Sequence, residues 1–222
     1  MRTKNGRNII LAIAAILVAF IIVGFFAVAY INNSPGLYRY TVDIRGLENY
    51  ESGYITDIIV PLPVRDGQSV FTDDELQYKT FGNWKSLIIV TKFGKMLAFQ
   101  NVGGNLTRIH ATFSKKYPGG TVIRNITQES LSPVLPLVHS DYSLLDPGSD
   151  SRRDYSSIVY IPDTIKPLHG GSDYLNVSLE LFADEGMQHS ISGNVYKVQI
   201  SERIPPGVYN STKVVVHVSD RK

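Results

Sequence analysis

The stretch YRYTVDIR, residues 38–45, places a tyrosine, valine or isoleucine at every second position and a charged or polar residue between them. This alternation is typical of a β-strand that buries one face and exposes the other. We therefore expect the two tyrosines, Val42 and Ile44 to point into a core, and the intervening residues to face solvent. Residues 175–181 show the same pattern, with Leu, Val, Leu and Leu alternating with Asn, Ser and Glu.

Further short runs of this kind follow, separated by Gly, Pro, Asn and Asp. They lie at residues 54–60, 87–91, 94–102, 105–114, 158–161, 175–183, 195–204 and 208–218. The three runs between residues 87 and 114 are joined by Lys92-Phe93-Gly94 and by Gly103-Gly104, which have the composition of hairpin turns, so we expect a three-stranded meander. About ten strands and little helix predict an all-β fold, and they favour an immunoglobulin-like antiparallel β-sandwich.

Two local motifs add to this prediction. Thr72 and Glu75 have the spacing of a capping box, which predicts a short helix over Thr72–Tyr78. Residues 204–209, Ile-Pro-Pro-Gly-Val-Tyr, resemble the tyrosine corner of immunoglobulin-like sandwiches, in which a tyrosine bonds back to the backbone. The resemblance implies a sandwich, although the strand after such a corner should be followed by another and the chain ends at Lys222.

The N-terminal region has a different composition. Residues 9–31, IILAIAAILVAFIIVGFFAVAYI, carry no charge, and about 20 such residues suffice to cross a bilayer as a helix. Three basic residues precede this run and none follows before Arg39, which by the positive-inside rule keeps the N-terminus in the cytoplasm. We therefore predict a cytoplasmic tail at residues 1–8, a transmembrane signal anchor at 9–31 and an extracytoplasmic β domain at 37–222 of a single-pass cell-membrane protein.

Two alternatives remain open for this organisation. Ala27-Val28-Ala29 matches the small-x-small pattern of signal-peptide cleavage sites, but the apolar cores of signal peptides are about 7 to 15 residues long, which favours an uncleaved anchor. The β domain is either one unit or two subdomains, 37–127 and 157–222, joined by a loop at 128–156 that is rich in Pro, Ser, Asp and Gly.

The chain has no cysteine, so the exported domain must be held by its core alone. Five Asn-x-Ser/Thr triplets follow the apolar run, and they make candidate N-glycosylation sites of Asn32, Asn105, Asn125, Asn176 and Asn210. The alternative is that these triplets are accidental polar turns. Sequons without cysteines on an exported domain favour an archaeal cell surface over an animal one.

No residue set predicts catalysis or cofactor binding. The five histidines lie far apart without His-Glu-x-x-His spacing, and no Gly-x-Ser-x-Gly elbow occurs; His110 and His217 fall within strand runs. Asp146, Asp150 and Asp154 surround a Pro-Gly-Ser loop, but two arginines in that loop would repel calcium. We therefore assign no catalytic residue, no cofactor and no metal site.

The charge distribution also excludes nucleic acid as a partner. Without the three basic residues that precede the apolar run, 19 basic residues stand against 20 acidic ones, so no basic surface is predicted. The sequence favours a protein that is not an enzyme and that acts by interaction, as an envelope component or an accessory subunit of a membrane complex. Its expected partners are the lipid bilayer, through the helix, and an envelope protein or glycan. The alternatives are an anchored hydrolase with its site between Gln128 and Ser156, and a ligand-binding sensor domain.

Overall fold

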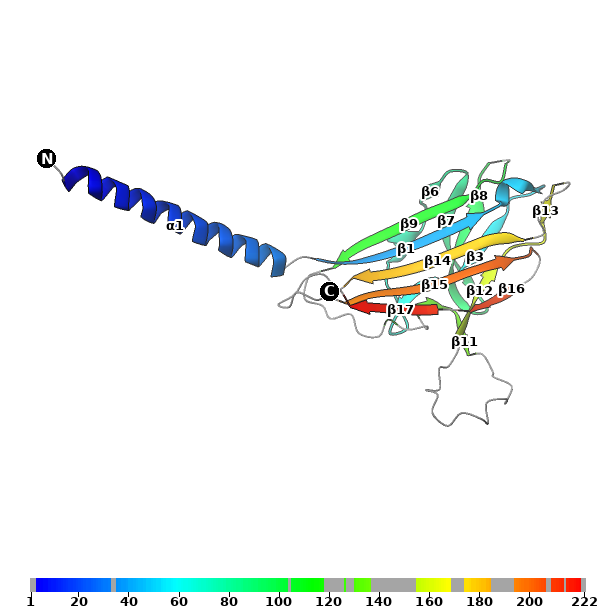
Figure 1. Cartoon of the computed structure of the whole chain (residues 1–222). Coiled ribbons are helices and arrows are strands. Elements are labelled where there is room, and N and C mark those ends of the chain that lie inside the picture. Colours follow the sequence, from blue (N-terminus) through cyan, green and yellow to red (C-terminus); the bar gives the residue numbers. More distant parts are fainter. Residues whose placement is uncertain are drawn as a thin grey trace, which may run out of the picture.

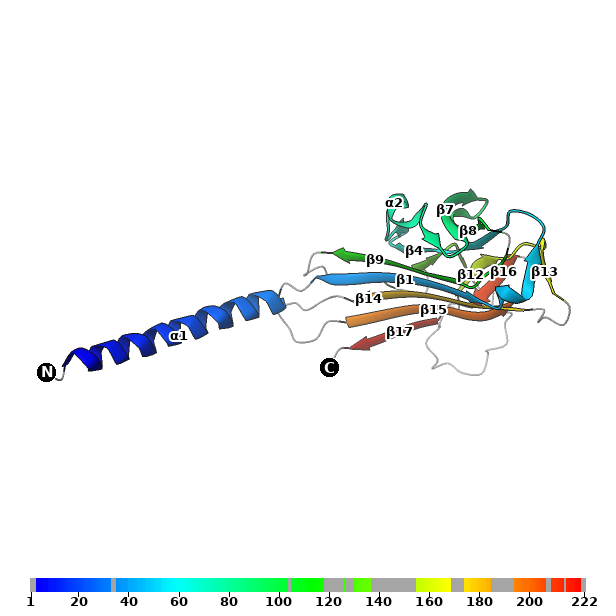
Figure 2. The same cartoon turned by 90° about the horizontal axis from the view of Figure 1, so that it is seen from above.

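The structure is a computed structural model of the whole chain. A long N-terminal helix projects from one end of a β domain in which strands form two facing layers (Figures 1 and 2). The structure describes residues 3–32, 35–103, 105–117, 126, 130–136, 155–168, 174–184, 194–206, 209–213 and 215–220.

The helix α1 extends from Thr3 to Asn32 and contains the apolar residues 9–31. Its described side chains from residue 13 to residue 28 are all exposed, and Phe20 and Phe25 each expose 71% of their surface. The first strand begins at Gly36. Within the part of the chain that the structure describes, no helix is both long enough and apolar enough to span a membrane.

The described part of the β domain contains seventeen strands, a 3-10 helix η1 at Leu47–Asn49 and a short helix α2 at Asp73–Leu76. The strands are β1 Gly36–Arg45, β2 Tyr50–Ser52, β3 Asp57–Val60, β4 Leu62–Arg65, β5 Gln68–Ser69, β6 Thr80–Phe81, β7 Trp84–Thr91, β8 Gly94–Asn101, β9 Ile109–Tyr117, β10 Leu131–Ser132, β11 Val134–Pro136, β12 Tyr155–Tyr160, β13 Ile165–Pro167, β14 Leu175–Asp184, β15 Asn194–Ile204, β16 Tyr209–Lys213 and β17 Val215–Asp220.

One layer is a five-stranded sheet with the order β17-β15-β14-β1-β9, in which all neighbouring strands are antiparallel. β1 lies between β14 and β9, so that Val42 is opposite Leu179 on one side and Ala111 on the other. These three side chains are fully buried, as are Tyr40 and Ile44, and Tyr38 is 6% exposed. Asp43, which we predicted to face solvent, is 8% exposed. The period-2 pattern of residues 38–45 therefore correctly predicted which face of β1 packs into the core.

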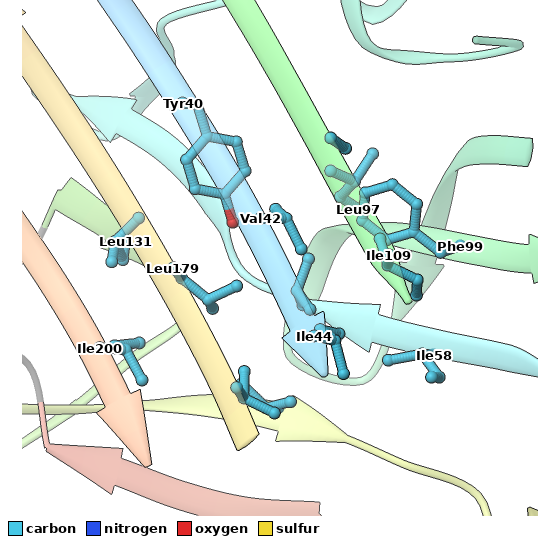
Figure 3. Close-up of a cluster of buried hydrophobic side chains, with 14 of the residues drawn as sticks. Tyr40, Val42, Ile44, Ile58, Leu97, Phe99, Ile109, Leu131, Leu179 and Ile200 are labelled. Carbon is cyan, nitrogen blue, oxygen red and sulfur yellow. The ribbon is translucent and has the colours of Figure 1, made fainter. Parts of the chain in front are cut away.

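The other layer is built on a sheet with the order β11-β12-β3-β8-β7-β6, to which β16 pairs through β12. Two small sheets have the orders β10-β4-β5 and β13-β2. Side chains from both layers form one hydrophobic core, in which Val42 and Leu179 lie with Ile58 and Phe99 (Figure 3). The predicted all-β class with antiparallel sheets is confirmed.

The predicted three-stranded meander is wrong in its third strand. β7 and β8 form a hairpin, with Thr91 opposite Gly94. β9, however, leaves this sheet and pairs with β1 of the five-stranded sheet. The physical reason is the apolar face of β9, because Ile109, Ala111 and Phe113 are buried against the core alongside β1 rather than beside β8.

The predicted single strand at residues 208–218 is divided between the layers. β16 pairs with β12, whereas β17 pairs with β15 of the five-stranded sheet. A strand that changes sheets in this way closes one end of a two-layer fold, because each half completes the edge of a different sheet.

The predicted capping box is confirmed. The Thr72 hydroxyl accepts a hydrogen bond from the backbone N–H of Glu75 at 3.3 Å, and the Glu75 carboxylate accepts one from the backbone N–H of Thr72 at 2.7 Å. The helix ends at Leu76, two residues before the predicted end, and the buried Leu76 side chain fixes it to the core. Lys115 of β9 also donates to the Glu75 carboxylate, at 3.0 Å.

Candidate interaction site at the tip of the β domain

The strand register places several distant segments at the end of the β domain opposite α1. β1 begins at Gly36, next to α1, and ends at Arg45. Because Arg45 is opposite Asn176 and Ile44 is opposite Ile109, the segments before β14 and before β9 meet the segment after β1. Figure 1 shows β13 at this end and α1 at the other. Ten extended residues separate the two ends by about 33 Å.

We define the tip as residues 52–56, 100–103, 105, 168 and 174, all of which lie in or beside these segments. Their mutual contacts support the grouping. The backbone N–H of Leu168 donates to the carbonyl of Asn49, which follows β1, at 2.8 Å. The backbone N–H of Asn101 donates to the carbonyl of Thr56, also at 2.8 Å.

Exposed apolar side chains gather at the tip. Among the described residues outside α1, seven large apolar or aromatic side chains are exposed, and two of these, Tyr78 and Val90, lie elsewhere. The five at the tip are Tyr54, Ile55, Val102, Leu168 and Tyr174. Tyr54 exposes 79% of its surface and Ile55 exposes 75%. Single exposed apolar residues are ordinary, whereas a group of them typically marks a binding surface.

An open cavity of about 490 Å³ lies at the surface of the tip, between residues 52–55 and residues 100–103. Its lining consists of serine and tyrosine hydroxyls, two amide side chains, two glycines and the aliphatic Ile55 and Val102. No acidic or basic side chain lines it.

Local hydrogen bonds lie within each half of the cavity wall. The hydroxyls of Ser52 and Thr56 lie 2.6 Å apart. The Asn101 side-chain oxygen accepts from the backbone N–H of Gly103 at 3.2 Å, and the carbonyl of Asn105 accepts from the Asn83 amide at 3.2 Å. Because the loops are fixed before any ligand arrives, binding loses less conformational entropy.

Two polar side chains at the edge of the tip have no hydrogen-bond partner for a polar atom among the described residues; that atom is buried in Asp57, whereas Gln100 is partly exposed to solvent. Asp57 and Gln100 are opposite each other where β3 and β8 pair. The buried oxygen Oδ1 of Asp57 has no hydrogen-bond partner among the described residues. Within the same residues the Gln100 side chain, which lines the cavity, also makes no hydrogen bond. The amide of Gln100 is therefore available to a ligand.

A second cluster, of charged residues, lies on the outer face of the five-stranded sheet. Arg108 donates to Asp43 from Nε to Oδ1 at 2.6 Å and from Nη2 to Oδ2 at 2.9 Å, and Arg45 donates from Nε to Oδ2 at 2.7 Å. Burial alone would raise the pKa of the Asp43 carboxyl, but the hydrogen bonds and charges of the two arginines outweigh it and lower that pKa below its usual value. The carboxylate is therefore a structural counter-ion.

This cluster does not have the order of a nucleophilic site. Across the sheet, Asp43 is opposite His110 on β9 and opposite Ser178 on β14, so the carboxylate separates the imidazole from the hydroxyl. His110 Nδ1 is 3.7 Å from Asp43 Oδ1. In a catalytic triad the imidazole lies between the other two groups. An open cavity of about 620 Å³ beside the cluster is lined by both Asp43 and Asn176.

Neither the tip nor the charged cluster was predicted. The alternation in residues 38–45 did place Asp43 and Arg45 on the same face of the strand, so the sequence indicated two of the residues of the charged cluster. Arg108 is 65 positions from Asp43, and the tip combines four segments of the chain. Only strand pairing brings these residues together.

The candidate glycosylation sites lie in different environments. Asn176 is exposed on the outer face of β14, as predicted, and Asn105 is exposed at the tip. Asn32 is the last residue of α1, and Asn210 lies in β16 opposite Val159. Asn125 lies outside the described residues. Whether any of the five carries a glycan stays a prediction.

The other residues considered for chemistry are only partly described. His110 is exposed on β9, and His217 lies in β17 opposite Lys197. Asp146, Asp150 and Asp154 lie outside the described residues, as does most of the loop 128–156. Within the described ranges, no group of three or more acidic, histidine or cysteine side chains could hold a metal ion.

Comparisons of the chain with protein-family profiles, with curated proteins and with solved structures found no match.

Proposed function

We propose that this protein is a single-pass membrane-anchored protein whose extracytoplasmic β domain acts by interaction, as an envelope component or an accessory subunit of a membrane complex. The observation that carries the proposal is the gathering of exposed apolar side chains at the tip, the end of the domain farthest from α1. A surface of this kind favours contact with a partner over solvation.

The anchoring part of the proposal rests on the sequence of residues 9–31. That run carries no charge over 23 residues, and the basic residues Arg2, Lys4 and Arg7 precede it. The described helix itself gives this part of the proposal no support, because no helix among the described residues is long and apolar enough to span a membrane. With this helix in the membrane, the tip would stand about 33 Å beyond the start of β1, within reach of neighbouring envelope molecules. The sequons and an archaeal cell surface belong to the same proposal, because both require export.

An immunoglobulin-like arrangement of the two layers is also part of the proposal. It is supported by two antiparallel sheets that share one core and by a C-terminal segment that changes from one sheet to the other between β16 and β17. A crystal structure of the domain with Greek-key strand connections would support the immunoglobulin-like assignment. A different order of connections would contradict that assignment, but it would not affect the proposed interaction role.

Topology is tested first. A tag is placed after Lys222, and intact cells or spheroplasts are treated with protease. We expect the tag to be digested while a cytoplasmic control protein survives. If the tag is protected, the domain lies inside the cell and the proposed anchoring is wrong.

The interaction role is tested by photo-crosslinking in cells. A benzoylphenylalanine is introduced in place of Ile55 at the tip or, as a matched control, in place of Val90, which is 81% exposed elsewhere on the domain. We expect a discrete crosslinked product from position 55 and none from position 90. Equal crosslinking from both positions, or no crosslinking from position 55, would show that the tip is not the contact surface.

A further inference from the structure

The tip cavity carries no charged side chain, and this restricts its ligands. Its walls are Ser52, Gly53, Tyr54 and Ile55 on one side and Gln100, Asn101, Val102 and Gly103 on the other. A charged ligand would find no counter-charge among these eight residues. The cavity therefore suits a neutral ligand.

The lining also combines two kinds of surface. Tyr54 and Ile55 are largely exposed and present aromatic and aliphatic area. Gln100 supplies an amide that both donates and accepts hydrogen bonds and is not engaged elsewhere among the described residues, whereas the Ser52 hydroxyl is already bonded to Thr56 and to the Tyr54 carbonyl. A neutral sugar has the complementary surface, because its C–H face is apolar and its rim of hydroxyls both donates and accepts.

We infer that the tip cavity binds a neutral carbohydrate chain carried by another molecule. Within the proposed function, on which the location of the partner rests, that chain would belong to a glycan of the envelope. A protein partner is the competing occupant, but protein interfaces bury about 800 Å² on each side, which is a much larger surface than this cavity offers. The charge-free cavity fits the smaller neutral ligand better.

The geometry also raises the question of which molecule carries the glycan. Asn105, which begins a sequon, is exposed beside the cavity, and its carbonyl accepts hydrogen bonds from the side chains of Asn83 and Asn101. A glycan on Asn105 of the same chain could therefore compete for the cavity. Substituting Asn105→Gln removes that glycan and leaves the backbone contacts in place.

The test uses the full-length protein, purified in a zwitterionic detergent because sugar-based detergents would occupy the site. Neutral hexasaccharides of glucose, mannose and galactose are titrated by calorimetry and by saturation-transfer NMR, with a hexasaccharide of uronic acid as the charged comparison. We expect at least one neutral hexasaccharide to bind with a Kd of about 1 mM or tighter and the charged one to bind more weakly.

Variants locate the binding. Tyr54→Ala and Gln100→Ala should each weaken binding by about tenfold, since each removes one of the two recognition surfaces. Val90→Ala is the matched control, because Val90 is 81% exposed and lies opposite Lys95, at the other end of the β7-β8 hairpin from Gln100. The inference is overturned if no neutral hexasaccharide binds, or if Val90→Ala weakens binding as much as Tyr54→Ala does.

The remaining outcomes separate this inference from the proposed function. If the glycosylated protein binds saccharide only after Asn105→Gln, the glycan of the same chain occupies the cavity. The inference that the glycan is carried by another molecule is then wrong. If saccharides fail to bind but position 55 crosslinks to a protein, the interaction role stands and the carbohydrate inference falls. If saccharides bind but the C-terminal tag is protected inside cells, the carbohydrate site stands and the proposed function falls.

Discussion

Replacing Asp43 with asparagine tests the charged cluster on the five-stranded sheet. The carboxylate receives three hydrogen bonds from Arg45 and Arg108, and its side chain is only 11% exposed. A hydrogen bond to a charged group contributes about 1.5–3 kcal/mol. The two arginine side chains are 62% and 46% exposed, so solvent screens part of this, and we expect Asp43→Asn to lower the free energy of unfolding by about 2 kcal/mol.

The effect is measured by urea unfolding of the full-length protein, followed by fluorescence. Trp84 is the single tryptophan, it is fully buried, and its indole N–H donates to the carbonyl of Thr107 at 2.8 Å. Its emission therefore reports on the packing between the two layers. Asp57→Asn is the matched control, because the buried oxygen of Asp57 has no partner among the described residues and its substitution should not lower stability.

The pH dependence gives an independent check. Because the folded protein lowers the pKa of Asp43, the carboxylate stabilises the fold fully above the unfolded pKa of about 3.9, and this contribution is lost as the pH falls through the lower, folded pKa. The difference between the wild type and Asp43→Asn should therefore shrink in acid. The reasoning is refuted if Asp43→Asn and Asp57→Asn lower the free energy of unfolding equally at pH 7. It is also refuted if the stability difference between the wild type and Asp43→Asn is the same near about pH 2 as at pH 7.

Three further substitutions test the packing of the domain, each measured as a change in the urea midpoint. Tyr40→Phe leaves the buried carbonyl of Pro61 without the hydroxyl that donates to it at 2.7 Å, so we expect a loss of about 1–3 kcal/mol, and no loss would mean that water replaces the hydroxyl. Gly36→Ala places a methyl group against the Tyr117 ring and should cost about 1–3 kcal/mol, and Tyr117→Ala should relieve that cost; if it does not, the clash is not the cause. Thr72→Ala removes a helix cap and should cost about 1 kcal/mol, whereas Thr72→Ser should restore most of it, and equal losses from both would contradict the capping role.

The sequence by itself determined the local features of the β domain. Alternation with a period of two identified the buried face of β1 and of β14, because successive side chains of a strand point to opposite sides. The capping box at Thr72 identified α2, because a helix cap is formed by residues three positions apart. Each of these signals lies within a few neighbouring residues, so no knowledge of distant contacts is needed.

Tertiary structure alone decided which strands pair and therefore which functional groups meet. β9 looked like a continuation of the hairpin β7-β8, and its pairing with β1 depends on where its apolar face can be buried. That pairing brings Arg108 to Asp43, and together with the register of β14 it gathers Tyr54, Val102 and Tyr174 at the tip. Backbone hydrogen-bonding groups are the same along every strand, so partners and register are selected by the packing of the whole core, which no short stretch of sequence contains.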